Sequence, residues 1–304
     1  MDAHRDSQLR FPYTGHILIG LAALLWSSYG AVFRGVTIPS IEFLIIRASL
    51  TIVILSPFVW SSALKQGIWE DRAFFFLCGA SFTLYTFGFI LTTRNIGAAT
   101  AVSMQYSAPV YLFVAYILRG NRVELKRDYP KLIMVAVLII NSIWTTYRVT
   151  SLSFLLPAFM CGIGYAAFTW AVKRLSHRSP MLIVALNNVV SLMFYIPFLF
   201  LLDEPIRALS TNEILVVIFV AIFVNSLSYV IFSAGLRSVN ALEASFITLI
   251  EPVMNPILVI FILKEIPPVP DLFILAVILS SLVLELIQSQ KFMIQRRKVY
   301  ETHI

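Results

Sequence analysis

Two charged side chains stand inside apolar stretches that are long enough to cross a membrane. Glu251 lies beside Pro252 in the run ALEASFITLIEPVMNPILVIFIL, and Arg47 lies in the run IPSIEFLIIRASLTIVILSPFVW. At the helical rise of about 1.5 Å per residue, Glu251 would lie about 15 Å deep and Arg47 about 12 Å from one end of its run. A charge at such a depth is costly, so it usually binds a partner or takes part in function.

Each charge has a functional and a structural interpretation. Glu251 can bind a substrate ammonium group or carry a proton, or it can bond backbone amides near Pro252 and Pro256. Arg47 can bind a substrate carboxylate through its planar guanidinium, or it can pair with Glu251 or Glu42. The cost of an unpaired guanidinium favours the pairing, in which Glu251 would act as a structural latch.

Further polar and aromatic side chains occur in the neighbouring apolar runs. Together with the two charges, the candidate substrate-binding residues are Arg47, Tyr85, Gln105, Tyr106, Asn187, Asn225, Tyr229, Glu251 and Asn255. Buried amides need hydrogen-bond partners, and contacts between helices or with lipid explain many such residues. We nevertheless predict that Gln105, Tyr106, Asn187 and Asn225 approach one central space, which would favour substrate contact.

The composition places these residues in a membrane protein. Apolar residues make up 59% of the 304 residues and charged residues 13%, more apolar surface than a soluble core of this size can bury. Ten runs reach the roughly 20 residues of a membrane span, so the predicted fold is an all-α membrane protein with ten transmembrane helices. The runs cover residues 15–34, 38–60, 72–93, 97–118, 130–147, 153–172, 181–202, 213–233, 241–263 and 271–290.

The lysines and arginines predict how these spans are oriented. Of the 23 basic residues, 17 fall on the same side as the termini, five fall on the other side, and Arg47 lies within a span. Cytoplasmic segments carry the excess of basic residues, so the sequence predicts cytoplasmic N- and C-termini. The net charge of +7 therefore reflects topology and does not indicate nucleic-acid binding. The first apolar run is predicted to be a retained helix, because no cleavage site follows it.

The chain also repeats itself. Arg94 precedes Pro109 by 15 residues, and Arg237 precedes Pro252 by the same 15 residues. Five spans in each half is an odd number, so the two halves would be inverted relative to each other. Inverted repeats place a substrate site near the midplane, between the halves, and support alternating access.

These features resemble the EamA-type members of the drug/metabolite transporter superfamily over nearly the whole chain. The similarity is carried by Trp26 in LLWSSYG, by Arg47, and by the runs ATAVSMQYSAPVYLF and EASFITLIEPVMNPILVIFILKE. The resemblance implies two inverted five-helix repeats, residues 1–150 and 151–304, the second with a basic cytoplasmic tail. Spans 1–4 and 6–9 would surround a central cavity.

One position departs from the family pattern. Asn121 stands where the family usually has an acidic residue after span 4, whereas Glu265 is kept after span 9. The polar end of span 4 is therefore weaker than that of span 9, which puts a gating role for this end in doubt.

The resemblance implies a secondary transporter in the inner membrane that exports a small polar metabolite, an amino acid or related compound. The alternatives are an uptake or exchange permease for a nucleoside-like or cofactor metabolite and, in another class, a lipid-modifying membrane enzyme. The enzyme would need catalytic groups clustered at one interface, whereas the aspartates lie in tails, connections and span edges. The two cysteines and four histidines lack the spacing of a zinc site.

The predicted partners are a small-molecule substrate and the lipid bilayer, without a cofactor, a metal or nucleic acid. A homodimer is a further possibility, because Glu285 in the last span could contribute to an oligomer contact.

Overall fold

The computed structural model of the protein describes residues 13–29, 38–65, 68–96, 98–147, 155–201 and 207–263, together with residues 276, 280 and 283–284. Every regular element in these ranges is a helix, and no strand occurs among them. The all-α prediction is therefore confirmed for this part of the chain. The predicted tenth span, 271–290, falls almost entirely outside it.

The helices follow one another with short connections. The first half contains α2 (Thr14–Ser27), α4 (Ser40–Lys65), the short 3-10 helix η1 (Ile68–Asp71), α5 (Arg72–Asn95), α6 (Ala98–Gln105), α7 (Ala108–Leu118) and α8 (Leu125–Tyr147). The second half contains α9 (Leu155–Arg174), α10 (Pro180–Leu201), α11 (Thr211–Phe219), the π-helix η3 (Val220–Leu227), α12 (Ser228–Gly235), α13 (Ala241–Ile247) and α14 (Ile250–Leu263).

Six apolar helical stretches in the described residues are long enough to cross a membrane. They are Ser40–Val59, Ile68–Thr93, Thr100–Leu118, Leu155–Arg174, Pro180–Leu201 and Thr211–Gly235. Each coincides with one of the predicted spans to within a few residues. A helix can cross a bilayer because its backbone hydrogen bonds are satisfied internally, so the apolar side chains can face lipid.

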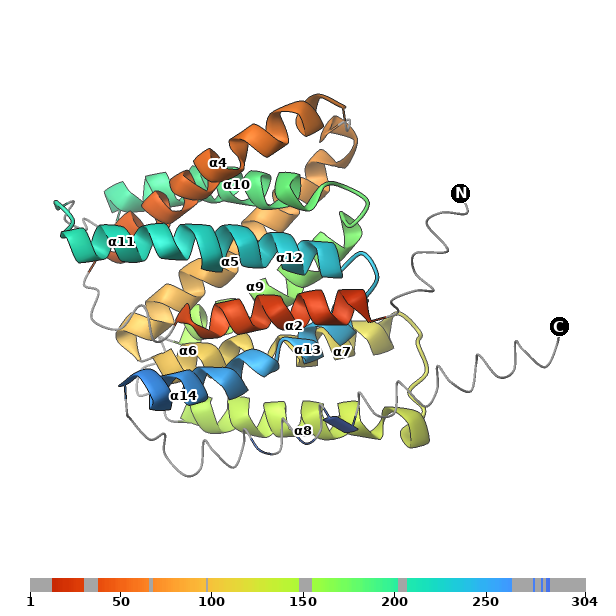
Figure 1. Cartoon of the computed structure of the whole chain (residues 1–304). Coiled ribbons are helices and arrows are strands. Elements are labelled where there is room, and N and C mark those ends of the chain that lie inside the picture. Colours follow the sequence, from red (N-terminus) through yellow and green to blue (C-terminus); the bar gives the residue numbers. More distant parts are fainter. Residues whose placement is uncertain are drawn as a thin grey trace.

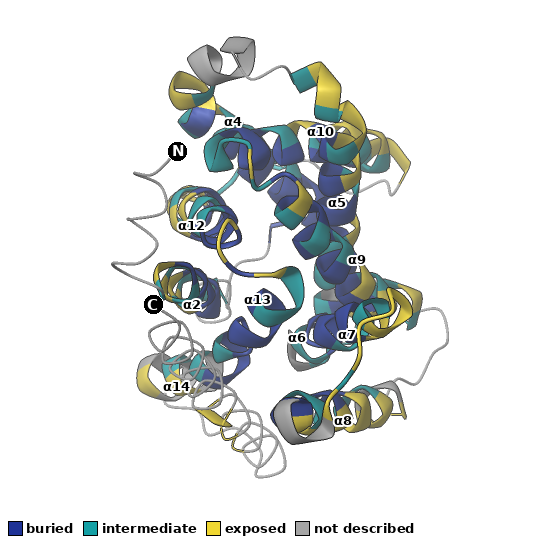
Figure 2. Cartoon of the chain, turned by 90° about the vertical axis from the view of Figure 1, so that its right-hand side faces the viewer, coloured by how far each residue is buried: buried dark blue, intermediate teal, exposed yellow. Residues whose placement is uncertain are grey.

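The helices pack side by side in one bundle (Figure 1). In a view along the bundle, buried residues face the middle, whereas exposed residues lie on the outside (Figure 2). The outside is apolar: Leu118, Phe200 and Phe261, for example, are each more than 75% exposed. An apolar exterior of this kind is suited to contact with lipid chains.

Two of the predicted spans are broken near their middle. α6 ends at Gln105 and α7 begins at Ala108, while α13 ends at Ile247 and α14 begins at Ile250. Pro109 and Pro252 follow the two breaks. Proline has no backbone N–H and clashes with the carbonyl four residues earlier, so it removes a helical hydrogen bond and favours a break at each site. The breaks thus occur at matching places in the two halves.

Another span contains a stretch of π-helix. Residues Val220–Leu227 adopt this wider helix between α11 and α12, and the hydroxyl of Ser226 donates to the carbonyl of Ala221, five residues back, at 2.6 Å. A π-turn changes which side chains face a given neighbour and is often found at functional sites. Here it turns Val224 and Asn225 toward different surroundings, as described below.

Two glycines allow α9 to approach its neighbours closely. A Cβ atom at Gly164 would lie 2.6 Å from the backbone nitrogen of Tyr85 in α5, and one at Gly162 would lie 2.6 Å from the carbonyl oxygen of Met104 in α6. Small residues let helix backbones come together in membranes. The close contacts fix the positions of Tyr85 and of Gln105, the residue after Met104.

Candidate functional site

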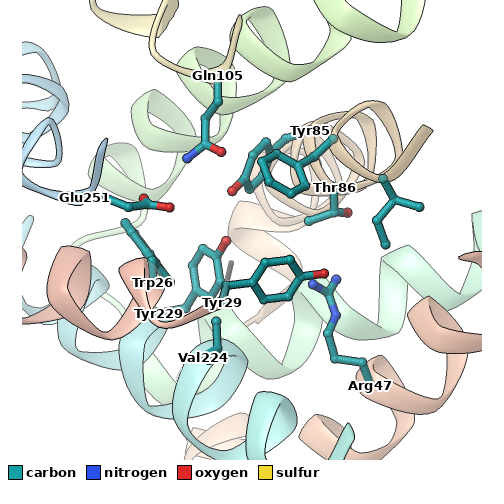
Figure 3. Close-up of a pocket in the computed structure, with 11 residues that line it drawn as sticks. Trp26, Tyr29, Arg47, Tyr85, Thr86, Gln105, Val224, Tyr229 and Glu251 are labelled. Atoms are coloured by element: carbon teal, nitrogen blue, oxygen red, sulfur yellow. The ribbon is translucent and has the colours of Figure 1, made fainter. Parts of the chain in front are cut away.

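A pocket lies inside the bundle, between helices from both halves of the chain. About 450 Å³ of space is free of protein atoms there, open solvent at its mouth included. The lining residues are Trp26, Tyr29, Arg47, Tyr85, Thr86, Phe89, Ile90, Gln105, Val224, Tyr229 and Glu251 (Figure 3). They come from α2, α4, α5, α6, η3, α12 and α14.

Arg47 forms one end of the pocket. Its side chain is buried, with 6% exposure, and its guanidinium carbon lies 5.7 Å from the centre of the Phe82 ring. Its Nε and Nη2 atoms have no hydrogen-bond partner. In the described part of the chain, no ion pair within 4.0 Å joins Arg47 to Glu251 or Glu42. The expected pairing is therefore wrong in this structure, and two donor atoms remain available to a ligand.

A hydrogen-bonded group of side chains holds the helix segment that carries Arg47. The hydroxyl of Thr51 donates to the Arg47 carbonyl at 2.9 Å and accepts from the Asn225 side-chain amide at 2.7 Å. The same amide donates to Oδ1 of Asn188 at 3.0 Å. These bonds join α4, η3 and α10, because the three residues come from three different elements. They fix the backbone of α4 at the pocket.

Glu251 forms the other end of the pocket, directly after the break between α13 and α14. Gln105 and Tyr106, at the break between α6 and α7, are its nearest polar neighbours. None of the three closes a well-formed hydrogen bond with another: Oε2 of Glu251, both amide atoms of Gln105 and the Tyr106 hydroxyl are buried without partners. Unpaired buried polar atoms are costly, so this end is prepared to bind a polar group.

Aromatic rings form the walls between the two ends. Tyr229 packs against Trp26 at 4.8 Å and against Phe82 at 5.0 Å between ring centres, and Tyr85 packs against Tyr165 at 5.2 Å. The indole N–H of Trp26 has no partner. The middle of the pocket is therefore mainly apolar, with a few polar groups at its edge.

The structure brings together five of the nine predicted binding residues. Arg47, Tyr85, Gln105, Tyr229 and Glu251 line the pocket. They come from α4, α5, α6, α12 and α14, so the fold collects them from elements far apart in sequence.

The other four predicted residues do not line the pocket. Tyr106 is buried near Glu251, and Asn187 lies against the thiol of Cys78. The Asn225 side chain donates hydrogen bonds to Thr51 and Asn188, as described above. The side chain of Asn255 lies outside the described residues. The expected convergence of Gln105, Tyr106, Asn187 and Asn225 on one space is not found, although all four are buried.

Several lining residues were not among the predicted binding residues. Trp26 and Tyr29 belong to the LLWSSYG run, whose sequence was informative only through the resemblance. Phe89 follows Tyr85 by one helical turn, and this spacing is a signal that could have identified it. Thr86, Ile90 and Val224 are ordinary residues for a membrane helix, so their sequence context carries no such signal.

Outside the pocket, ion pairs join helix ends from the two halves of the chain. At one end of the bundle, Nε of Arg178 donates to Asp71 at 2.7 Å, and His16 contacts Glu243 at 2.8 Å. The hydrogen bond to Asp71 raises the pKa of the Arg178 guanidinium above its usual range. Each of these pairs joins the first half of the chain to the second.

Comparison with known proteins finds similarity to membrane transporters. Residues 148–287 match the EamA-like transporter family. The chain is 24% identical over 213 residues to an uncharacterized inner membrane transporter, YicL, of Salmonella typhimurium (strain LT2), which covers 67% of this chain and 69% of that protein. A protein of known crystal structure has the same fold, with a TM-score of 0.72 and 14% identity over 91% of this chain and 98% of its own. These similarities support the predicted resemblance to EamA-type members of the drug/metabolite transporter superfamily.

Proposed function

We propose that the protein is a secondary transporter that exports a small zwitterionic metabolite, an amino acid or related compound, by alternating access around the pocket. The observation that carries the proposal is that Arg47 and Glu251 line one pocket while neither is paired with the other. A ligand with an anionic and a cationic group would satisfy both. The outward direction rests on the family resemblance alone.

The proposal includes the architecture that the sequence predicts. Residues 1–150 and 151–304 would form two inverted repeats of five helices, with both termini in the cytoplasm. The matching helix breaks before Pro109 and Pro252 support this duplication. Substrate would contact Arg47, Tyr85 and Gln105 from the first repeat, with Tyr229 and Glu251 from the second.

The broken helices support a mechanism for opening. A break leaves a few residues whose backbone can change direction without loss of the helices on either side. Both breaks lie beside the pocket, because Gln105 and Glu251 flank them. Movement of α13 or α7 about its break would therefore change access to the ligand while the rest of the bundle stays packed.

Transport by the purified full-length chain in liposomes tests this function. We expect vesicles loaded with a mixture of labelled amino acids and related zwitterions to exchange at least one of them faster than protein-free vesicles. Glu251→Gln should reduce this exchange, whereas Glu124→Gln, at an exposed site outside the pocket, should not. A correctly inserted protein that exchanges none of the compounds would contradict the proposal.

A further inference from the structure

The two ends of the pocket are set apart from each other. Arg47 and Glu251 lie at opposite ends in Figure 3, with Tyr229 between them, and no ion pair within 4.0 Å joins the two. A bound molecule that contacts both charged side chains must therefore extend across the pocket.

The Arg47 end is suited to a carboxylate. Nε and Nη2 lie on the same edge of the planar guanidinium, and both lack partners. Two parallel N–H donors of this kind bind a carboxylate through both of its oxygens. Arg47 is the one basic residue among the described residues that line the pocket. A carboxylate, with a single negative charge, matches it better than a doubly charged phosphate ester.

The Glu251 end is suited to a primary ammonium group. It offers two acceptors without partners that line the pocket, Oε2 of Glu251 and Oε1 of Gln105. A primary ammonium group has three N–H donors. A quaternary ammonium group has none, so it would leave these buried acceptors unpaired.

The middle of the pocket is suited to a hydrocarbon chain. Trp26, Tyr85 and Tyr229 present rings between the two ends. Methylene groups packed against such rings gain from the removal of apolar surface from water.

We propose that the pocket selects ω-amino carboxylates, whose amino and carboxylate groups stand at opposite ends of a short hydrocarbon chain. An α-amino acid carries both charges on one carbon atom, so it would occupy one end and leave the other unpaired. This inference rests on the proposed function and narrows its substrate from amino acids and related compounds to those with separated charges.

Binding of isomers to the full-length protein in lipid nanodiscs tests the inference. 5-Aminopentanoate and 2-aminopentanoate have the same atoms and charges and differ in the position of the amino group. Calorimetric titration should give a dissociation constant at least about tenfold lower for 5-aminopentanoate, since the α isomer loses one charged contact. Glycine, β-alanine, 4-aminobutanoate and 6-aminohexanoate would locate the best chain length.

Each other outcome has a distinct meaning. Equal or tighter binding of 2-aminopentanoate would overturn the inference and leave the proposed function standing. Failure of every compound in both series to bind would overturn both. Tighter binding of 2-aminoethyl phosphate than of β-alanine would overturn the assignment of a carboxylate to the Arg47 end.

Variants at the two ends provide a crossed control. Arg47→Gln should lower the affinity for 5-aminopentanoate to the affinity of the natural protein for pentylamine, which lacks the carboxylate. Glu251→Gln should lower the affinity for 5-aminopentanoate to the affinity of the natural protein for pentanoate, which lacks the amine. Glu124→Gln should behave as the natural protein does. If Arg47→Gln instead weakened pentylamine and 5-aminopentanoate equally, the assignment of the carboxylate to Arg47 would be wrong.

Discussion

The two charged ends of the pocket are built differently. Arg47 belongs to a continuous helix, α4, whose backbone is held by Thr51, Asn225 and Asn188. Glu251 follows a helix break, and its Oε2 atom has no hydrogen-bond partner. In the proposed mechanism, the Arg47 end is the fixed anchor and the Glu251 end belongs to the segment that moves. A transporter by alternating access needs both.

The largest expected effect is the loss of the anchor. Arg47→Gln should weaken the binding of a carboxylate ligand by about 2–5 kcal/mol, because a buried charge-assisted pair is lost. The melting temperature of the Arg47→Gln variant should not fall, since the substitution breaks no ion pair among the described residues. Titration of 5-aminopentanoate and a melting curve on the same sample measure both effects. A lower melting temperature without weaker binding would show that Arg47 is structural.

The next effect tests what holds the anchor. Asn225→Ala should destabilise the protein by about 1–3 kcal/mol, because Thr51 and Asn188 lose a buried partner. Ligand affinity should fall less than in Arg47→Gln. Asn240→Ala removes the amide that caps α13 and serves as a comparison, since it lies outside the pocket. Stability of Asn225→Ala equal to that of the natural protein would contradict the role of this group.

A smaller effect should come from closing one helix break. Pro252→Ala restores the backbone N–H that the helix lacks and should therefore slow exchange in liposomes severalfold while leaving binding within about tenfold. Pro57→Ala, at the exposed Pro57 inside α4, is the matched control. Equal slowing by both variants would remove the distinction between a fixed and a movable end.

The smallest effect concerns the stability of the movable end. Glu251→Gln keeps the size of the side chain and breaks no ion pair within the described residues, so the free energy of unfolding should change by less than about 1 kcal/mol. Thermal melting measures this change. A loss of stability as large as that of Asn225→Ala would restore the latch interpretation.

Much of the fold could be predicted from the sequence. The apolar runs required membrane helices, and six of them are present at nearly the predicted residues. This succeeded because backbone hydrogen bonding and chain length govern a membrane span locally. The two breaks lie just before Pro109 and Pro252, but α4 and α10 continue through Pro57 and Pro197, so a proline alone does not locate a break.

The site was predictable only in part. Arg47, Gln105 and Glu251 were recognisable because polar groups in apolar runs are costly. The sequence does not show that Val224 lines the pocket while Asn225 bonds to neighbouring helices. The π-helix decides this, because it alters which side chain faces the pocket. Asn187 and Asn188 are adjacent on α10, yet they face different partners.

By itself, the sequence determined that the chain enters a membrane as helices and which charged side chains lie within them. These properties depend on neighbours in the chain. Only the tertiary structure decided that Arg47 and Glu251 stand apart across an aromatic pocket and do not pair. That arrangement depends on how closely helices approach, as at Gly162 and Gly164, and contacts between distant segments cannot be read from local spacing.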